Sequence, residues 1–338
     1  MLNKAIIDLN KLIKNAKAVK SKLNNGVKFC AVVKADAYGH GACEISNALY
    51  PYVDAFAVAL AEEGVQLRRA GIDKPIICLN PPFNKDARLF VEYNLTATVY
   101  TREHLDLLEE WAKKVNGRAC VHVKVNTGMN RQGIDVGTQL KDFLDYLVRK
   151  KRVVLDGLYS HLSCPENKKR LKFQVNKFLV AKKLIKGYNN NATCHLSASG
   201  GFLSGVQEDM VRIGILLYGY KPFKSDKIHV EPIMKVYAPV LCKRRLKKGE
   251  SALYGVCKSK KAQTISLIRY GYADGLFRAR VKGQFNNRCM DITAITENVN
   301  GKYCLVIKDA EKIAKRYKTI NYEILTKCAV RAQKIYIR

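Results

Sequence analysis

Eight short apolar runs, mostly separated by helix-like segments, restrict the possible fold more than any other feature of this sequence. They are KFCAVV at 28–33, AFAVAL at 55–60, PIICL at 75–79, ATVY at 97–100, CVHVKV at 120–125, VLDGLY at 154–159, TCHLS at 193–197 and VRIGILL at 211–217. Segments with helical spacing lie between most of them, at 61–70, 102–115, 138–150 and 168–186. Apolar strands that alternate with helices indicate a parallel sheet. Eight of them within about 200 residues favour an α/β fold with a (β/α)8 TIM barrel over an open sheet.

The two ends of the chain follow other patterns. AIID at 5–8 predicts a short strand, and 10–23 has the apolar spacing of a helix. After a polar stretch at 221–229 come strand-like runs at 234–242, 263–268, 290–295, 303–307, 322–325 and 333–337. These runs predict a C-terminal all-β domain. We therefore expect a barrel over 1–225 and a β domain over 226–338, which the strand within 1–8 could join.

Composition excludes several classes of protein. The 48% hydrophobic content is ordinary for a globular chain, and no apolar run reaches the length of a membrane span. The N-terminus lacks an apolar signal core, so a cytoplasmic location is expected. The 11 cysteines are scattered without a CxxC pair, which favours reduced thiols and argues against a metal site.

The net charge of +31 is the least ordinary number, with 60 Lys and Arg against 29 Asp and Glu. Such an excess can indicate nucleic-acid binding. However, the basic runs, such as RKKR at 149–152 and KRRLKK at 243–248, are short and are not interleaved with aromatic residues. Steering of anionic ligands is a simpler consequence of this charge, and an RNA- or DNA-binding protein remains an alternative class.

Polar residues follow the apolar runs at the points where barrel strands would end. These residues are Lys34 after the first run, NTGMNR at 126–131 after the fifth, His161 after the sixth, SASGG at 197–201 from the end of the seventh, and Arg212 within the eighth. Active sites of such barrels lie at the C-terminal ends of the strands. Singly, each residue could be a rim lysine, a rim histidine or an ion-pair partner. Together they predict one site.

The chemistry of this group points to one cofactor. A lysine at the end of a buried strand is costly to bury as a cation, whereas a Schiff base with an aldehyde removes its charge. Ser197 with its neighbouring glycines, and the backbone N–H of Gly214, would suit a phosphate. A phosphate anchor and a strand-end lysine suggest pyridoxal 5'-phosphate. Neither a P-loop nor a GxGxxG motif is present, so nucleotide cofactors are disfavoured.

Seven motifs carry a resemblance to a known family. AVVKADAYGHG, VKVNTGMNRQG, LYSHLS, VRIGILLYG, GYADG, RCMDIT and INYEIL occur in the order found in alanine racemases. The resemblance covers most of the chain. It implies a homodimer with active sites shared across the interface, a barrel that binds pyridoxal phosphate, and a C-terminal β domain. The implied reaction is racemisation of L- and D-alanine, which supplies D-alanine for peptidoglycan.

The resemblance also implies catalytic roles. Lys34 would hold the cofactor and act as base on one face of the substrate, and Tyr272 of the partner subunit would act on the other. Arg212 would bond the pyridine nitrogen, and His161 would link it to Tyr272. Arg131 would bond the cofactor's phenolic oxygen and the substrate carboxylate. Removing a proton from one face and delivering one to the other requires two groups of matched pKa. Burial can lower the pKa of a lysine such as Lys34, and cationic neighbours can lower the pKa of a lysine or of a tyrosine.

Further residues match the family motifs in binding roles. Lys124 matches a lysine that is often carbamylated. Tyr38, Ser197, Gly214, Ile215 and Tyr322 would hold the phosphate, and Met290 and Asp291 would approach the substrate from the partner subunit.

The sequence departs from the family in ways that bear on selectivity. The segment at 276–287 is shorter than usual, Leu196 replaces an asparagine, and Asn130 replaces a glycine. A racemase for serine or a basic amino acid is therefore the close alternative, although Tyr322 would crowd larger side chains and favours alanine. A non-catalytic pyridoxal-phosphate carrier would lack the second domain and the opposing tyrosine.

Overall fold

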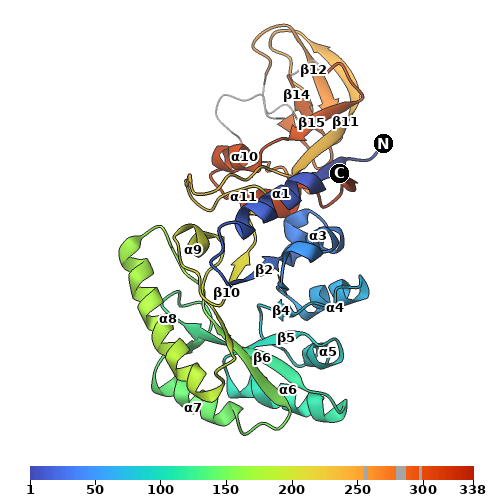
Figure 1. Cartoon of the computed structure of the whole chain (residues 1–338). Coiled ribbons are helices and arrows are strands. Elements are labelled where there is room, and N and C mark those ends of the chain that lie inside the picture. Colours follow the sequence, from blue (N-terminus) through green and yellow to red (C-terminus); the bar gives the residue numbers. More distant parts are fainter. Residues whose placement is uncertain (255–257, 279–286, 297–298) are drawn as a thin grey trace. The chain divides into compact units, whose positions relative to one another are not determined.

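The computed structural model describes residues 1–254, 258–278, 287–296 and 299–338. The chain forms two compact units (Figure 1). The barrel unit contains 12–37 and 42–231, and the sheet unit contains 1–11, 38–41 and 232–338. The N-terminal strand and the tetrapeptide 38–41 are thus part of the sheet unit.

Eight parallel strands make the barrel. They are β2 (Lys28–Val32), β3 (Ala55–Val58), β4 (Ile76–Cys78), β5 (Thr96–Val99), β6 (Ala119–Asn126), β8 (Val153–Tyr159), β9 (Thr193–His195) and β10 (Met210–Ile213). The order is β10-β2-β3-β4-β5-β6-β8-β9, with the short β7 (Ile134–Asp135) beside β6. Between β9 and β10 the Arg212 amide donates to the Ser197 carbonyl at 2.9 Å, which nearly closes the barrel. The predicted barrel and its eight strands are confirmed.

Helices lie around these strands (Figure 1). They are α1 (Leu9–Lys20), α2 (Lys34–Gly39), α3 (Ala42–Leu49), α4 (Ala61–Arg69), α5 (Ala87–Glu92), α6 (Arg102–Lys114), α7 (Thr138–Leu147), α8 (Lys168–Tyr188) and α9 (Ser199–Leu203). In α6, Leu105, Leu108 and Ala112 recur at three- and four-residue spacing and are buried, so its apolar stripe faces inward. The four helices expected between the strands are confirmed.

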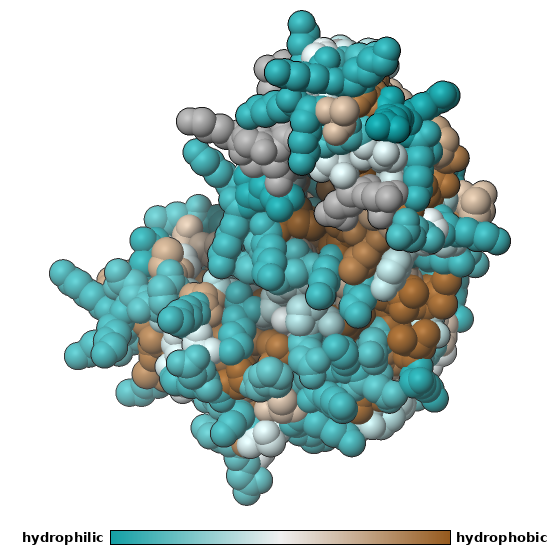
Figure 2. Space-filling view, turned by 90° about the horizontal axis from the view of Figure 1, so that it is seen from above, coloured by the Kyte–Doolittle hydropathy of each residue, from teal (hydrophilic) through white to brown (hydrophobic). Residues whose placement is uncertain are grey.

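The charge excess leads one to expect a largely hydrophilic exterior. Figure 2 shows hydrophilic side chains over most of the displayed face. Across the described part of the chain, none of the helices is both long and apolar enough to cross a membrane.

A mixed sheet forms the second unit. Its order is β13 (Asn287–Arg288), β14 (Thr293–Ile295), β12 (Gln263–Ile268), β11 (Met234–Leu246), β1 (Lys4–Asp8) and β16 (Gln333–Ile337), with β15 (Tyr303–Ile307) also paired to β11. β1 pairs antiparallel with β11 and parallel with β16. The N-terminal strand is therefore an inner strand of this sheet.

The predicted strand at 322–325 is wrong, and the second domain is not purely β. Those residues lie in helix α11 (Asn321–Cys328), which follows helix α10 (Ala310–Tyr317). Ile324, Leu325 and Cys328 are buried together on one side of α11. This helical spacing extends beyond the four residues of the predicted strand, and a short apolar run cannot by itself distinguish strand from helix. The run at 290–295 forms a strand only over 293–295.

Candidate active site

Lys34 lies two residues beyond the end of the buried strand β2 and begins a left-handed turn. Residues 35–38 all have φ between 52° and 54°. This conformation costs L-residues roughly 1–2 kcal/mol each, so other contacts must hold the turn. Asp36 Oδ1 accepts from the Ala42 amide at 2.8 Å, and Glu63 Oε1 accepts from the Ala35 amide at 2.6 Å. These carboxylates fix the backbone beside Lys34.

The Lys34 amine is poised toward its neutral form. Burial and the cations Arg131 and Arg212 lower its pKa, while Glu63 acts in the opposite direction. A neutral amine is the nucleophilic and proton-accepting form of lysine. The position at the strand end therefore both fixes the place of the Lys34 amine and favours its reactive, neutral form.

Lys124 points from β6 into the same cationic surroundings. Its side chain is buried, and burial together with Arg131, Arg212 and Lys34 lowers the pKa of the amine to about 7. The Nζ atom donates to Gln132 Oε1 at 2.7 Å and lies 5.2 Å from the centroid of the Tyr159 ring. A buried lysine with cations for neighbours is a group that gains from losing its charge.

Arg212, on β10, is buried and held by backbone oxygens. It donates to the carbonyls of Ser160 at 2.7 Å, His195 at 3.0 Å and Leu196 at 3.2 Å. His161 Nδ1 lies 3.5 Å from Arg212 Nη2. Burial and then the Arg212 charge lower the pKa of His161 to about 3, so its ring is neutral near pH 7. The structure thus brings His161 and Arg212 together.

Four basic side chains therefore gather at one end of the barrel. They are Lys34, Lys124, Arg131 and Arg212. Both arginines lower the pKa of each lysine, and Lys34 also lowers that of Lys124. Among the described carboxylates, none lies within 4.0 Å of the Arg212 guanidinium. Such a cluster favours an anionic ligand. A cofactor with a phosphate and a phenolic oxygen fits this set of hydrogen-bond donors. The Lys34 amine in the same set could react with an aldehyde group of that cofactor.

The residues expected at the phosphate are buried in the loops after β9 and β10. Ser197 Oγ donates to the Val206 carbonyl at 2.7 Å, and the Gly214 amide donates to Ser199 Oγ at 3.2 Å. Ile215 is buried beside Gly214. These groups come from the strand ends that the sequence predicted.

Tyr38 and Tyr322 meet within the sheet unit. Their ring centroids are 5.8 Å apart, and the planes are tilted by 46°. Burial raises the pKa of Tyr322 to about 12 and raises that of Tyr38 as well, so both hydroxyls stay protonated. A Cβ on Gly39 would lie 2.5 Å from the Leu325 carbonyl oxygen, and φ there is 83°. Glycine therefore allows the turn to approach α11.

Tyr272, Met290 and Asp291 are neighbours in the sheet unit. Tyr272 begins the short helix η2 (Tyr272–Asp274), is 38% exposed, and donates its amide to the Cys289 carbonyl at 3.2 Å. A Cβ on Gly271 would lie 2.0 Å from the Met290 carbonyl oxygen. Asp291 Oδ1 accepts from Arg331 Nη1 at 2.7 Å. Of the shortened segment at 276–287, residues 279–286 lie outside the described residues.

Comparisons with known proteins decide the family. The family model for the alanine racemase N-terminal domain matches residues 7–222, and the model for its C-terminal domain matches 233–336. The chain belongs to the alanine racemase family. The resemblance in the seven sequence motifs is therefore confirmed.

Relatives of the family match over most or all of the chain. An alanine racemase of Treponema denticola is 36% identical over 82% of this chain and 76% of its own length. One of Aquifex pyrophilus is 30% identical over 100% of this chain and 99% of its own. Among solved structures, an alanine racemase of Clostridium difficile is 30% identical with a TM-score of 0.93, covering 100% of this chain and 96% of its own. One of Bacillus anthracis with bound L-Ala-P has 28% identity and a TM-score of 0.90, covering 99% and 95%.

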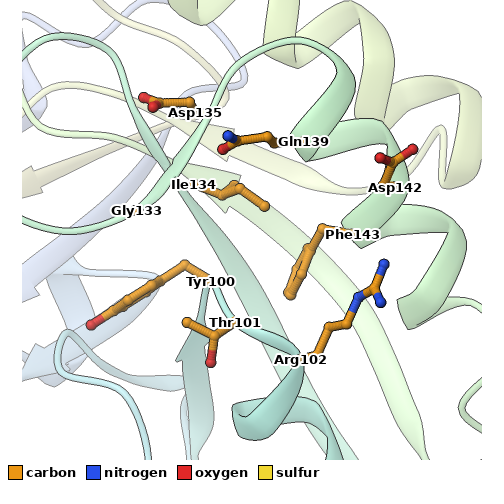
Figure 3. A pocket seen from close by; sticks show the side chains of 9 residues that line it. All are labelled: Tyr100, Thr101, Arg102, Gly133, Ile134, Asp135, Gln139, Asp142 and Phe143. Atoms are coloured by element: carbon orange, nitrogen blue, oxygen red, sulfur yellow. The ribbon is translucent and has the colours of Figure 1, made fainter.

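A cavity opens beside β7 in the barrel unit (Figure 3). This cavity, of about 460 Å³, has nine lining residues: Tyr100, Thr101, Arg102, Gly133, Ile134, Asp135, Gln139, Asp142 and Phe143. None of the residues predicted for the active site lines it.

Sequence reasoning missed four residues that hold this site. Glu63 anchors the turn after Lys34, Gln132 accepts from Lys124, and His122 and His195 connect to Arg212. The available signal was a polar residue inside a buried strand, as in CVHVKV and TCHLS. Such a residue requires a partner, although the sequence does not reveal which one.

Proposed function

We propose that this chain interconverts L- and D-alanine with pyridoxal 5'-phosphate held at Lys34. Membership of the alanine racemase family supports the substrate and the reaction. The observation that carries the proposal is the Lys34 amine, placed at the end of β2 with its pKa lowered by burial and by two arginines. The sheet unit, with Tyr272 in its GYADG motif, favours this reading over a non-catalytic cofactor carrier.

The cofactor would be held by the residues that match the family motifs. When bound, it withdraws electrons from the substrate α-carbon and so makes the α-proton removable. Arg212 would bond its ring nitrogen, and Arg131 its phenolic oxygen and the substrate carboxylate. The phosphate would be held by Tyr38, Ser197, Gly214, Ile215 and Tyr322.

Two groups would then move the proton. Lys34 would accept or donate it on one face of the α-carbon, and Tyr272 of the partner subunit would do so on the other. The neutral His161 would connect Arg212 to that tyrosine, and Met290 and Asp291 of the partner would contact the substrate. Arg212, which does not readily give up a proton, would keep the ring nitrogen unprotonated and so favour prompt return of the proton to carbon. We also propose a homodimer in the cytoplasm that supplies D-alanine for peptidoglycan.

Absorbance and polarimetry test this function. Purified protein should show the visible absorbance of a lysine-bound pyridoxal cofactor, and borohydride should abolish it and leave the cofactor covalently attached. L-alanine and D-alanine should each be converted to the racemate. A colourless protein that takes up no pyridoxal phosphate, or a coloured one that leaves both enantiomers unchanged, would contradict the proposal.

Replacing Tyr322 with alanine should broaden the range of substrates. The half-buried ring stands 5.8 Å from that of Tyr38, so its removal leaves space next to a proposed phosphate ligand. We expect kcat/KM for serine to rise relative to alanine by about 10-fold, the scale of one or two methylene groups in a pocket. Tyr303→Phe, which keeps a ring in the same unit, is the control. If the ratio of serine to alanine turnover does not rise, Tyr322 is not the gate, and wild-type preference for serine would favour the alternative racemase.

Replacing Lys124 with methionine should stabilise the cofactor-free protein at low pH. A lysine whose pKa falls from 10.5 to about 7 on folding binds fewer protons in the folded state, so stability rises with pH between those values. Below pH 7 the amine must be buried as a cation, and methionine removes this cost. We expect Lys124→Met to raise Tm more at pH 6 than at pH 9, measured in buffer free of carbon dioxide.

The control for this prediction is Lys183→Met, because Lys183 is exposed on α8. A lower Tm for Lys124→Met at pH 6 would contradict the prediction. Carbamylation has a separate readout, in which labelled bicarbonate gives a carbamate carbon resonance in the wild type that Lys124→Met lacks.

A further inference from the structure

A chain of hydrogen bonds crosses the barrel core from Arg212 to the surface. Arg212 Nη1 lies 2.6 Å from His195 Nδ1, His195 Nε2 lies 2.8 Å from His122 Nδ1, and His122 Nε2 lies 3.2 Å from Asp156 Oδ2. The first three residues are buried, whereas the Asp156 side chain is 55% exposed. The four side chains come from β10, β9, β6 and β8.

The hydrogen bonds from Arg212 to Asp156 can be donated in only one direction. A guanidinium donates hydrogen bonds and cannot accept them, so His195 Nδ1 is the acceptor. Burial and the Arg212 charge hold the pKa of His195 well below its usual value, so the ring is neutral and its single proton is on Nε2. His122 Nδ1 must then accept, and His122 Nε2 donates to the Asp156 carboxylate. The His122 hydrogen bond in turn lowers the pKa of Asp156 and keeps it ionised.

Local packing fixes both rings. The His195 ring stacks on the Tyr159 ring with centroids 4.9 Å apart and planes within 1°. A Cβ at Gly157 would lie 2.6 Å from His122 Nε2, so glycine at this position of β8 makes room for the ring. The pairing of β6 with β8 also shifts register between Val121 and His122. These features leave each imidazole little freedom to turn.

We propose that Asp156, His122 and His195 are positioning residues that orient Arg212 toward the ring nitrogen of the cofactor. The proposal rests on the function proposed above. Arg212 otherwise bonds neutral groups, and the two imidazoles are its only hydrogen-bonded connection to a carboxylate within the described ranges. Chains of hydrogen bonds polarise one another, so the Asp156 charge strengthens His195 Nδ1 as acceptor and holds the guanidinium in one orientation. A side chain on the outside of the barrel thereby acts on the reaction centre.

Nitrogen NMR of the histidines tests the geometry without any turnover. The chain has six histidines, so labelled histidine gives a spectrum that His122→Gln and His195→Gln variants can assign. We expect Nδ1 of both His122 and His195 to be unprotonated, and a scalar coupling between His195 Nε2 and His122 Nδ1 across their hydrogen bond. A protonated Nδ1 on either ring, or no coupling, would overturn the proposed histidine relay, the series of hydrogen bonds from Arg212 through His195 and His122 to Asp156.

Variants at Asp156 test its effect on Arg212. Asp156→Asn keeps an acceptor for His122, whereas Asp156→Leu removes it. Asp106→Leu is the matched control, because Asp106 is also half-exposed, at 51%, and also accepts side-chain hydrogen bonds, from Tyr146 and Lys150. Asp156→Leu should weaken the coupling between the histidines and lower kcat about 10-fold, with KM for alanine changed less than about 2-fold. Asp156→Asn keeps the hydrogen bond from His122 without the charge, so it should recover only part of both.

Two outcomes separate this proposal from the proposed function. If Asp156→Leu matches Asp106→Leu in kcat and leaves the coupling unchanged, the positioning role is wrong even though the enzyme racemises alanine. If wild-type protein does not racemise alanine, the proposed function is wrong, and the Arg212 guanidinium resonances then carry the test. They should broaden in Asp156→Leu and stay sharp in Asp106→Leu, and unchanged resonances would overturn the positioning role.

Discussion

Replacing Lys34 with alanine should abolish racemisation in both directions, by at least about 10³-fold, since both the cofactor link and one of the two bases are lost. The structure gives a physical reason for so large an effect. Burial and then the neighbouring arginines lower the pKa of the Lys34 amine, and a second lysine, Lys124, is buried in β6 with Gln132 as its hydrogen-bond acceptor. Another lysine is therefore not free to take over.

The measurement pairs turnover with covalent capture. Wild-type protein treated with pyridoxal phosphate and borohydride should gain the mass of one reduced cofactor per chain, and Lys34→Ala should gain none. Lys183→Ala, an exposed position on α8, is the control and should behave as wild type. Partial recovery of Lys34→Ala by added methylamine would identify the missing group as an amine. A variant that retains a tenth of wild-type turnover would remove Lys34 from the mechanism.

The barrel was predictable from sequence because its strands are buried on both faces. Runs such as AFAVAL and PIICL are apolar throughout, and the strands β3 and β4 are buried at every position. At 322–325 the same kind of signal failed, because α11 has only eight residues and half of them are buried. Periodicity cannot distinguish strand from helix over four residues. The second unit therefore contains two helices that the sequence did not predict.

The site was predictable to the extent that it follows from strand ends. Lys34, His161 and Arg212 were found by that rule, and the structure places them near one another. The left-handed turn after Lys34 was not predictable, because alanine and tyrosine give no local reason for a positive φ and a single aspartate does not specify four such residues in a row. The Ala42 amide donates to Asp36 and the Ala35 amide donates to the distant Glu63, and these bonds help to hold the turn.

The histidine relay was hidden for a different reason. His122 and His195 are 73 residues apart, and His122 and Asp156 are 34 apart. Their contact depends on the order of β6, β8 and β9 in the barrel and on a register shift between two of these strands. A single sequence specifies neither the strand order nor the register shift. A polar residue in a buried strand indicates that it has a hydrogen-bond partner, but only the register of the folded strands identifies that partner.

Replacing Tyr272 with phenylalanine should leave proton exchange on one enantiomer while conversion between enantiomers falls about 10²–10⁴-fold. The substitution removes the hydroxyl and keeps the ring. The backbone bond from residue 272 to the Cys289 carbonyl is unaffected, and a side chain that is 38% exposed contributes little to stability through its hydroxyl. In D₂O, Lys34 alone should still exchange the α-hydrogen of the enantiomer that presents it to that face. Tyr303→Phe, in the same unit, is the control.

Mixed dimers decide which subunit supplies the tyrosine. If Tyr272 acts on the partner's site, a dimer of one Lys34→Ala chain and one Tyr272→Phe chain has one site with both changes and one with neither. Two inactive variants should then recover about a quarter of wild-type activity after random reassociation into two-fold dimers. If Tyr272 acted within its own chain, every site in that dimer would carry one change and no activity would return. Recovery therefore requires that the two proton carriers of each site come from different chains.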